Sequence, residues 1–276
     1  MYSLWPDGTF NVQKIKIADG RRRIPALILS PRLRAGKCAC VLWLHGGGYF
    51  LGMKEMVYMS RAVELVNKYG VVVVSPGYRL AFQAPYPAAL EDCYSALKYI
   101  RQNADTLGID AGQIMVGGES AGGGLCAALC MLARDRGEVK IAYQMPLYPM
   151  LDNFDTASSR NNYGRVWNTR RNHFAWRMYL RGDAKKHVAP YASPARAQDY
   201  SGLPPAYTFV GDGEPFYCET VSYINALKSC GIPAELDIYH TDMHAFDMMQ
   251  PDNAQAKAAA ASFNAHFEYA LKSYHT

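Results

Sequence analysis

Long hydrophobic runs, paired cysteines and a recognisable leader are all missing from this chain of 276 residues. No apolar run approaches the roughly 18 residues that a membrane-spanning helix needs. Residues 1–7 supply neither the basic segment nor the hydrophobic core of a signal peptide. The seven cysteines are an odd number and form no C-x-x-C pair with the spacing of a zinc site. We therefore expect a cytoplasmic protein whose thiols are reduced and buried.

A strong charge of either sign is also lacking, since the net charge is only +5. Basic residues gather at 21–23 and again at 165–187. Nucleic-acid binding would need a stronger basic stripe with interleaved aromatic residues, so no nucleic-acid partner is expected. The basic segments are interpreted either as solvated faces or as a mild attraction for anionic substrates.

Signals for a metal or a cofactor are absent as well. No cluster of His, Asp or Glu has the spacing of metal ligands. The glycine runs at 46–48 and 122–124 are not followed by the Lys-Ser/Thr ending of a phosphate-binding loop. No G-x-G-x-x-G opens a helix in the context of a dinucleotide-binding unit. We expect neither a metal nor a cofactor.

Apolar runs alternate with helical periodicity along most of the chain, which predicts a mostly parallel, doubly wound α/β sheet. The run at 71–74 is apolar throughout, as in central strands that are buried on both faces. Residues 1–276 are expected to form a single domain. The predicted strands are 12–17, 26–29, 40–44, 71–74, 114–117, 142–145, 207–210 and 235–239, and the predicted helices 58–69, 88–102, 125–134, 172–180, 218–230 and 252–271.

One segment, residues 150–203, interrupts this alternation. It has no strand pattern, is rich in Arg, Asn and aromatic residues, and contains one expected helix at 172–180. A connection of this length inside a compact domain is usually functional. We interpret it as a cap or lid inserted into the sheet domain.

The pentapeptide Gly118-Glu119-Ser120-Ala121-Gly122 lies between an apolar run and a helix-forming run. That context fits a nucleophile elbow, in which a sharp strand-to-helix turn presents a serine at the edge of the sheet. Small residues also gather at ordinary tight turns, so the motif alone leaves a purely structural turn open.

A serine nucleophile needs a base, and the base needs an acid that fixes its tautomer. In this chain Asp212 and Glu214 follow one predicted strand, and His244 follows the next. The order serine, acid, histidine is that of the α/β-hydrolase arrangement. All three sites come at the carboxyl ends of predicted parallel strands, where such folds build active sites.

A second motif, His45-Gly46-Gly47-Gly48, directly follows a predicted strand. Consecutive glycines expose backbone N–H groups that can stabilise the oxyanion of a tetrahedral intermediate. The N–H of Ala121, just after the serine, would complete such a hole.

Together these motifs resemble the hormone-sensitive lipase-like family of α/β-hydrolases, the HGGG carboxylesterases. The resemblance runs from about 41 to 246. It rests on His45-Gly46-Gly47-Gly48, Tyr78-Arg79-Leu80, the stretch 87–110 with Asp92 and Asp110, Gly118-Glu119-Ser120-Ala121-Gly122-Gly123 and His244-Ala245-Phe246.

The resemblance implies an α/β-hydrolase fold, Ser120 and His244 as nucleophile and base, and Gly47, Gly48 and Ala121 as oxyanion donors. Three departures stand out. Glu119 replaces the usual Asp before the serine. The family's Asp-Pro-hydrophobe acid motif appears as Glu214-Pro215-Phe216, so Glu214 is the expected acid and Asp212 the alternative. Only 44 residues precede His45, so the cap is expected to come from residues 150–203.

These features predict a serine carboxylesterase that hydrolyses short-chain, acetyl-like esters, acetylated sugars among them, through an acyl-enzyme. Tyr49, Phe50, Tyr163 and Trp167 are the candidate residues of an aromatic substrate pocket. The expected partner is a small-molecule ester. The oligomeric state stays open, with a homodimer among the options. A peptidase or amidase on the same fold, or a non-catalytic receptor resembling the plant gibberellin receptor, remain the alternative functions.

Overall fold

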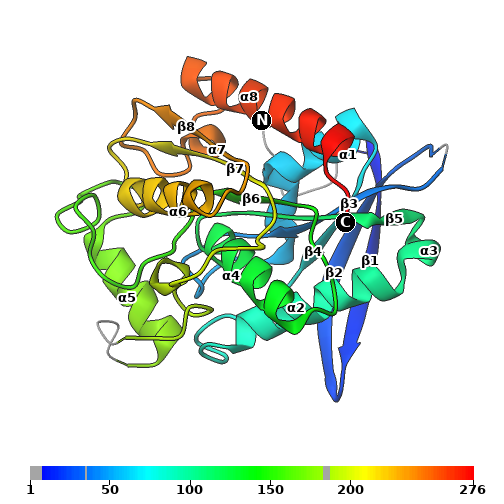
Figure 1. Ribbon diagram of the computed structural model, residues 1–276, viewed down its shortest axis with the longest axis horizontal. Coiled ribbons are helices and arrows are strands. Elements are labelled where there is room, and N and C mark those ends of the chain that lie inside the picture. The colour runs from blue at the N-terminus through cyan, green and yellow to red at the C-terminus, as the bar shows by residue number, and fades with distance from the viewer. Residues whose placement is uncertain (1–7, 35, 183–186) are drawn as a thin grey trace.

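The structure, a computed structural model, describes residues 8–34, 36–182 and 187–276. It contains one eight-stranded sheet with helices on both faces (Figure 1). The strands are β1 (Phe10–Asp19), β2 (Arg22–Pro31), β3 (Cys38–Leu44), β4 (Val72–Pro76), β5 (Ile109–Glu119), β6 (Tyr143–Leu147), β7 (Ala206–Gly211) and β8 (Ala234–Tyr239). The helices are η1 (Lys54–Met59), α1 (Arg61–Tyr69), α2 (Ala88–Gln102), α3 (Ala104–Leu107), α4 (Ala121–Arg136), α5 (Thr169–Leu180), η2 (Pro194–Arg196), α6 (Tyr217–Ser229), α7 (Phe246–Met249) and α8 (Ala254–Ser273).

The strand order is β1-β2-β4-β3-β5-β6-β7-β8. β1 and β2, which contain the predicted strands 12–17 and 26–29, form an antiparallel hairpin, and β2 pairs antiparallel with β4. The pairs from β4 through β3 to β8 are parallel. The predicted, mostly parallel α/β sheet is therefore confirmed. Because parallel strands point the same way, the segments that follow β3, β5, β6, β7 and β8 all emerge at one edge of the sheet.

The central strands are buried on both faces and feed two separate cores. In β3, Cys40, Leu42 and Leu44 face one core, while Val41 and Trp43 face the other. Helices α2, α4 and α6 cover the first core, and α1 and α8 cover the second (Figure 1). Alternate side chains of a strand point to opposite faces, so a continuous apolar run is the sequence that a doubly covered strand requires.

Local capping explains where the structure differs from the predicted helix boundaries. The helix expected at 58–69 divides into η1 and α1, because Ser60 adopts an extended backbone and its side chain accepts from the Ala62 N–H at 3.1 Å. The helix expected from Leu125 instead begins at Ala121, directly after the serine turn. The short helices α3 and α7 were not predicted, since four residues carry no periodic signal.

Residues 150–203 connect β6 to β7, and within them the structure describes one α-helix, α5, and the short η2. Four residues of this segment, 183–186, lie outside the described residues. Glu219 on α6 accepts from the Leu151 N–H at 2.6 Å, and the Ser193 hydroxyl donates to the Leu151 carbonyl at 2.8 Å. The described part is therefore hydrogen-bonded both to the sheet domain and to itself.

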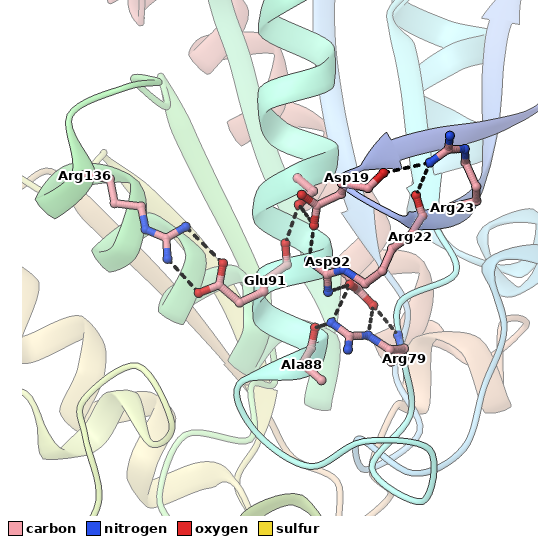
Figure 2. A network of polar contacts seen from close by, with 10 residues as sticks. Asp19, Arg22, Arg23, Arg79, Ala88, Glu91, Asp92 and Arg136 are labelled. Carbon is pink, nitrogen blue, oxygen red and sulfur yellow. Dashed lines mark hydrogen bonds and ion pairs between the residues drawn. The ribbon is translucent and has the colours of Figure 1, made fainter.

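A buried carboxylate ties the N-terminal hairpin to the segment that follows β4 (Figure 2). Asp92 on α2 is 2% exposed and accepts from both the side chain and the backbone N–H of Arg79, at 2.8 and 3.0 Å. Arg22 at the hairpin donates to the other oxygen at 2.8 Å. Asp92 is buried while both arginines are partly exposed, so the network holds the turn that carries Tyr78 through charge-assisted hydrogen bonds to a desolvated carboxylate.

No helix in the described ranges is long and apolar enough to cross a bilayer. Within the same ranges, no three His, Cys, Asp or Glu side chains are grouped as metal ligands would be. The seven cysteines are free thiols. Cys40, Cys93, Cys126 and Cys130 are buried, but Cys230 is exposed at the end of α6, so the expectation of buried thiols was wrong there.

Candidate active site

Ser120 occupies the turn between β5 and α4 with φ +57° and ψ −118°. A residue other than glycine adopts such a backbone only at a cost of about 1–3 kcal/mol. Its N–H donates to the Leu147 carbonyl, and its carbonyl accepts from the Met150 N–H, both at 3.0 Å. A Cβ at Gly122 would lie 2.0 Å from the Leu44 carbonyl oxygen, so only glycine allows α4 to begin this close to β3.

His244 and Glu214 reach the same edge of the sheet from the segments after β8 and β7. His244 Nε2 lies 2.8 Å from Ser120 Oγ, and His244 Nδ1 is hydrogen-bonded to Glu214 Oε2. The three residues are buried. With Nδ1–H donating to the carboxylate, Nε2 carries the lone pair that can take the serine proton.

The surroundings of Glu214 strengthen its interaction with the histidine. Burial raises the pKa of Glu214, and the neighbouring His244 opposes that rise. Among the described residues, its second oxygen, Oε1, has no hydrogen-bond partner. A charge that forms on the imidazole therefore faces a poorly solvated carboxylate, whose attraction is less screened than in water.

Asp212, the alternative acid, lies away from His244. Its carboxylate bonds to His240 Nδ1 at 2.8 Å, and this contact raises the pKa of the exposed His240. Its backbone N–H donates to the Tyr239 carbonyl at 2.9 Å. The carboxylate that the fold brings to His244 is that of Glu214.

The glycine loop after β3 passes close to the serine. A Cβ on Gly46 would lie 3.4 Å from Ser120 Cβ. Gly48 has φ +59°, and a Cβ there would lie 2.3 Å from the Trp167 ring. In the described structure, the N–H groups of Gly47, Gly48 and Ala121 donate to no protein acceptor. Unpaired N–H groups beside a nucleophile can bind an oxyanion.

The side chains of His45 and Tyr78 form hydrogen bonds with the backbone of this loop. His45 Nδ1 bonds to the Gly46 carbonyl at 2.7 Å, and the Tyr78 hydroxyl donates to the His45 carbonyl at 2.7 Å. The two rings stack with centroids 4.1 Å apart. Burial lowers the pKa of His45 to about 4, so this imidazole is neutral at physiological pH. Its contacts are those of a structural residue.

Three aromatic rings surround the imidazole of His244. Tyr148 and Phe216 contact it edge-to-face at centroid distances of 5.2 and 5.1 Å, and Trp167 lies at 6.4 Å. Sequence reasoning missed Tyr148. Its position immediately after β6, at the edge where the other site residues emerge, was the signal available.

The remaining candidate pocket residues occupy different environments. Tyr49 is fully buried and its hydroxyl donates to the Met150 carbonyl at 2.8 Å. Phe50 is half-buried and contacts Phe174 of α5 at a centroid distance of 5.1 Å. Tyr163 is 89% exposed. Trp167 and Phe50 are the two that adjoin Gly48.

Known proteins match both the sequence and the fold of this chain. A family model described as the alpha/beta hydrolase fold covers residues 41–248. The chain belongs to the hormone-sensitive lipase-like family of α/β-hydrolases. The family expected from the motifs is thereby confirmed, and the protein is a carboxylesterase.

Characterised relatives cover most of this esterase. It is 33% identical to an arylesterase of Saccharolobus solfataricus over 87% of this chain and 78% of that protein. It is 30% identical to an ethyl acetate hydrolase of Pseudomonas putida over 76% of this chain and 67% of that protein. The crystal structure of the esterase LipW from Mycobacterium marinum superposes with a TM-score of 0.88 at 30% identity, covering 95% and 82% of the two chains.

The residue before Ser120 belongs to a buried cluster of ionisable side chains. Glu119 accepts from Trp43 Nε1 at 2.7 Å. Burial raises its pKa to about 8; Asp247 adds to the rise, while Arg61 opposes it. Asp247 is itself paired with Arg61 at 3.0 Å and accepts from the Tyr148 hydroxyl at 2.9 Å. Glu119 is thus directed into the core below the serine turn.

The raised pKa of Glu119 predicts how stability depends on pH. A carboxyl whose pKa rises from 4.5 to about 8 on folding contributes its full stabilisation below pH 4.5 and loses it as pH rises toward 8. Glu119→Gln keeps an acceptor for Trp43 but cannot ionise. Between pH 4.5 and 8, we expect the variant to gain about 5 kcal/mol in unfolding free energy relative to the wild type, measured by urea denaturation. If the unfolding free energies of the variant and the wild type changed with pH in parallel, the raised pKa of Glu119 would be contradicted.

The choice of acid leads to a second prediction. We expect Glu214→Gln to lower kcat on p-nitrophenyl acetate by about a thousandfold, because a neutral amide cannot stabilise the imidazolium. Asp212→Asn is the matched control, with an expected change of less than about threefold because its carboxylate bonds to the exposed His240 and not to His244. Steady-state kinetics of both variants measure the difference. A larger loss in Asp212→Asn would reverse the assignment.

Proposed function

We propose that this esterase hydrolyses short-chain acyl esters, acetates above all, through an acyl-enzyme on Ser120. The observation that carries the proposal is the hydrogen-bonded series Ser120, His244 and Glu214 beside the unpaired N–H groups of the glycine loop. An intact base and acid at the serine favour catalysis over the receptor alternative, which lacks the base.

In the proposed reaction, Ser120 Oγ attacks the ester carbonyl carbon as its proton passes to His244 Nε2. The negative charge on the carbonyl oxygen is held by the N–H groups of Gly47, Gly48 and Ala121. His244 then gives the proton to the departing alkoxide, which leaves as the alcohol. A water molecule, deprotonated by the same nitrogen, attacks the acyl carbon. The bond from that carbon to Ser120 Oγ breaks, His244 returns the proton to Oγ, and the carboxylic acid is released.

The oxyanion donors and Glu214 have distinct roles in this reaction. One oxyanion donor contributes about 3–4 kcal/mol to transition-state stabilisation in comparable sites. Glu214 holds the Nδ1–H tautomer and offsets the positive charge of the imidazolium, without itself taking up the proton. Both contributions require that the oxyanion donors and the Glu214 carboxylate are in place before the substrate binds. Burial and hydrogen bonding of the site favour this.

The preference for small acyl groups is supported by the position of Trp167. Its ring occupies the space beside Gly48, where a Cβ would lie 2.3 Å from it, and it approaches the imidazole of His244. A bulky ring next to the proposed oxyanion donors leaves less room for a long acyl chain. The relative named ethyl acetate hydrolase points to the same class of substrate. Acetylated sugars belong to this class, because aromatic rings also stack on sugar faces.

Residues 150–203 are proposed to serve as the cap of this site. Trp167 and Phe174 belong to this segment and bring aromatic rings to the glycine loop. The cytoplasmic location expected from the sequence stays a prediction.

An acyl-length series tests the proposal. With p-nitrophenyl esters from acetate to decanoate, we expect kcat/KM to be highest for acetate to butyrate and to fall for longer chains. Ser120→Ala is expected to abolish turnover of every ester. Trp167→Ala is expected to raise the decanoate-to-acetate ratio by about tenfold, because the ring no longer occupies the space beside Gly48.

Tyr269→Ala, which removes an exposed aromatic ring from α8, is the control for the Trp167 change and is expected to leave the ratio unaltered. A wild-type preference for decanoate would refute the short-chain proposal. Turnover by Ser120→Ala at the wild-type rate would refute the acyl-enzyme.

A further inference from the structure

A groove of about 520 Å³ lies along α5 and the loop that precedes it. This volume is within the range of small-molecule sites. The groove is lined by three arginines, Arg160, Arg170 and Arg177, together with asparagine, threonine, tyrosine and histidine side chains, and no Asp or Glu is among its lining residues. Two arginines of the basic segment 165–187, Arg170 and Arg177, thus line one concave surface.

The three guanidinium groups of this groove are uncompensated. Within the described ranges, Arg160, Arg170 and Arg177 form no ion pair and donate no side-chain hydrogen bond. The adjacent Arg171 differs, since its guanidinium is hydrogen-bonded to backbone carbonyls. The histidine of the groove, His173, is also partnered, by Asp155 at 2.6 Å. Three planar guanidinium groups facing one space supply the donors that a carboxylate or a phosphate binds best.

Hydrogen bonds hold the polar residues that line the groove. The Thr169 hydroxyl donates to the Ser159 carbonyl at 2.6 Å, and Asn162 accepts from the Gly164 N–H at 2.9 Å. The Asn162 amide also donates to the Gly213 carbonyl at 3.1 Å, directly before Glu214 in the chain. The groove is therefore attached to the loop that carries the proposed catalytic acid.

The spacing of α5 connects the groove with the reaction centre. Arg170, Phe174 and Arg177 follow one another at intervals of four and three residues, so they share one face of the helix. The Phe174 ring contacts Phe50, whose own ring lies 3.1 Å from the position of a Cβ on Gly48. A chain of neighbouring side chains thus leads from the glycine loop to the two arginines.

We propose that this groove binds an anionic group, a carboxylate or a phosphate, on the alcohol part of the ester, so that the enzyme prefers esters with a negatively charged leaving group. The acyl group then lies next to the Trp167 ring. The alcohol part extends past Phe50 and Phe174 toward the arginines of α5. This substrate class rests on the proposed ester hydrolysis at Ser120.

The decisive comparison uses two acetates of nearly identical shape. 3-Acetoxybenzoate carries a carboxylate, and 3-acetoxybenzamide carries a neutral amide in its place. We expect wild-type kcat/KM to favour the benzoate by about fivefold or more, with most of the difference in KM, because an open site screens each charge contact. The ratio is expected to fall toward one as salt is raised.

The double variant Arg170→Gln/Arg177→Gln tests which residues recognise the charge. Its benzoate-to-benzamide ratio is expected to drop to about one. Arg101→Gln, in the last turn of α2, makes the same chemical change and is expected to leave the ratio as in the wild type. α3, which follows this turn, lies on the opposite side of the molecule from α5 (Figure 1). A wild-type ratio near one overturns the proposal. A preference that persists in the double variant, or equal losses on both esters, also overturns it.

A binding measurement separates this proposal from the proposed function. Calorimetric titration of the wild type with 3-hydroxybenzoate and 3-hydroxybenzamide requires no turnover, and tighter binding of the benzoate that is lost in the double variant supports the groove even if acetates are poor substrates. Equal affinities overturn it. Replacing the benzoate with 3-acetoxyphenyl phosphate in the kinetic assay shows which anion the groove prefers. The preferred anion is the one whose ester has the larger kcat/KM relative to 3-acetoxybenzamide.

Discussion

The strained backbone of Ser120 is the constraint on which the site depends. Its positive φ costs free energy, and the turn persists because hydrogen bonds to the ends of β6 and to Met150 hold it on both sides. The close approach of α4 to β3 at Gly122 leaves the turn no room to relax. The hydroxyl therefore lies at the edge of the sheet, 2.8 Å from Nε2 of His244, the proposed base.

Three buried carboxyl groups near this turn have different surroundings. Glu214 faces the imidazole with one oxygen and has no described partner for the other, which suits a residue that responds to charge on His244. Glu119 is directed into the core against Trp43, with a raised pKa. Asp247 is neutralised by Arg61. The three carboxyl groups differ in their partners, so the protein stabilises their charged forms to different degrees.

Much of this arrangement could be predicted because parallel strands place their carboxyl ends together. Because β5 and β8 are parallel, the segments that carry Ser120 and His244 emerge at the same edge of the sheet. The choice between Asp212 and Glu214 was harder, since both leave the same strand and only the backbone turn after β7 decides which carboxylate reaches the base. The place of Trp167 depends on tertiary packing against Gly48, for which the local sequence carries no pattern.

The central claim is that Ser120 becomes covalently acylated, and mass spectrometry of the protein after reaction with a fluorophosphonate tests it most directly. The account predicts a single adduct per chain, located by proteolysis and fragmentation on the serine of the Gly118–Gly122 pentapeptide. It also predicts that labelling slows sharply in Glu214→Gln, in which the base is less well supported. An unmodified chain, or an adduct on any residue other than Ser120, would contradict the account.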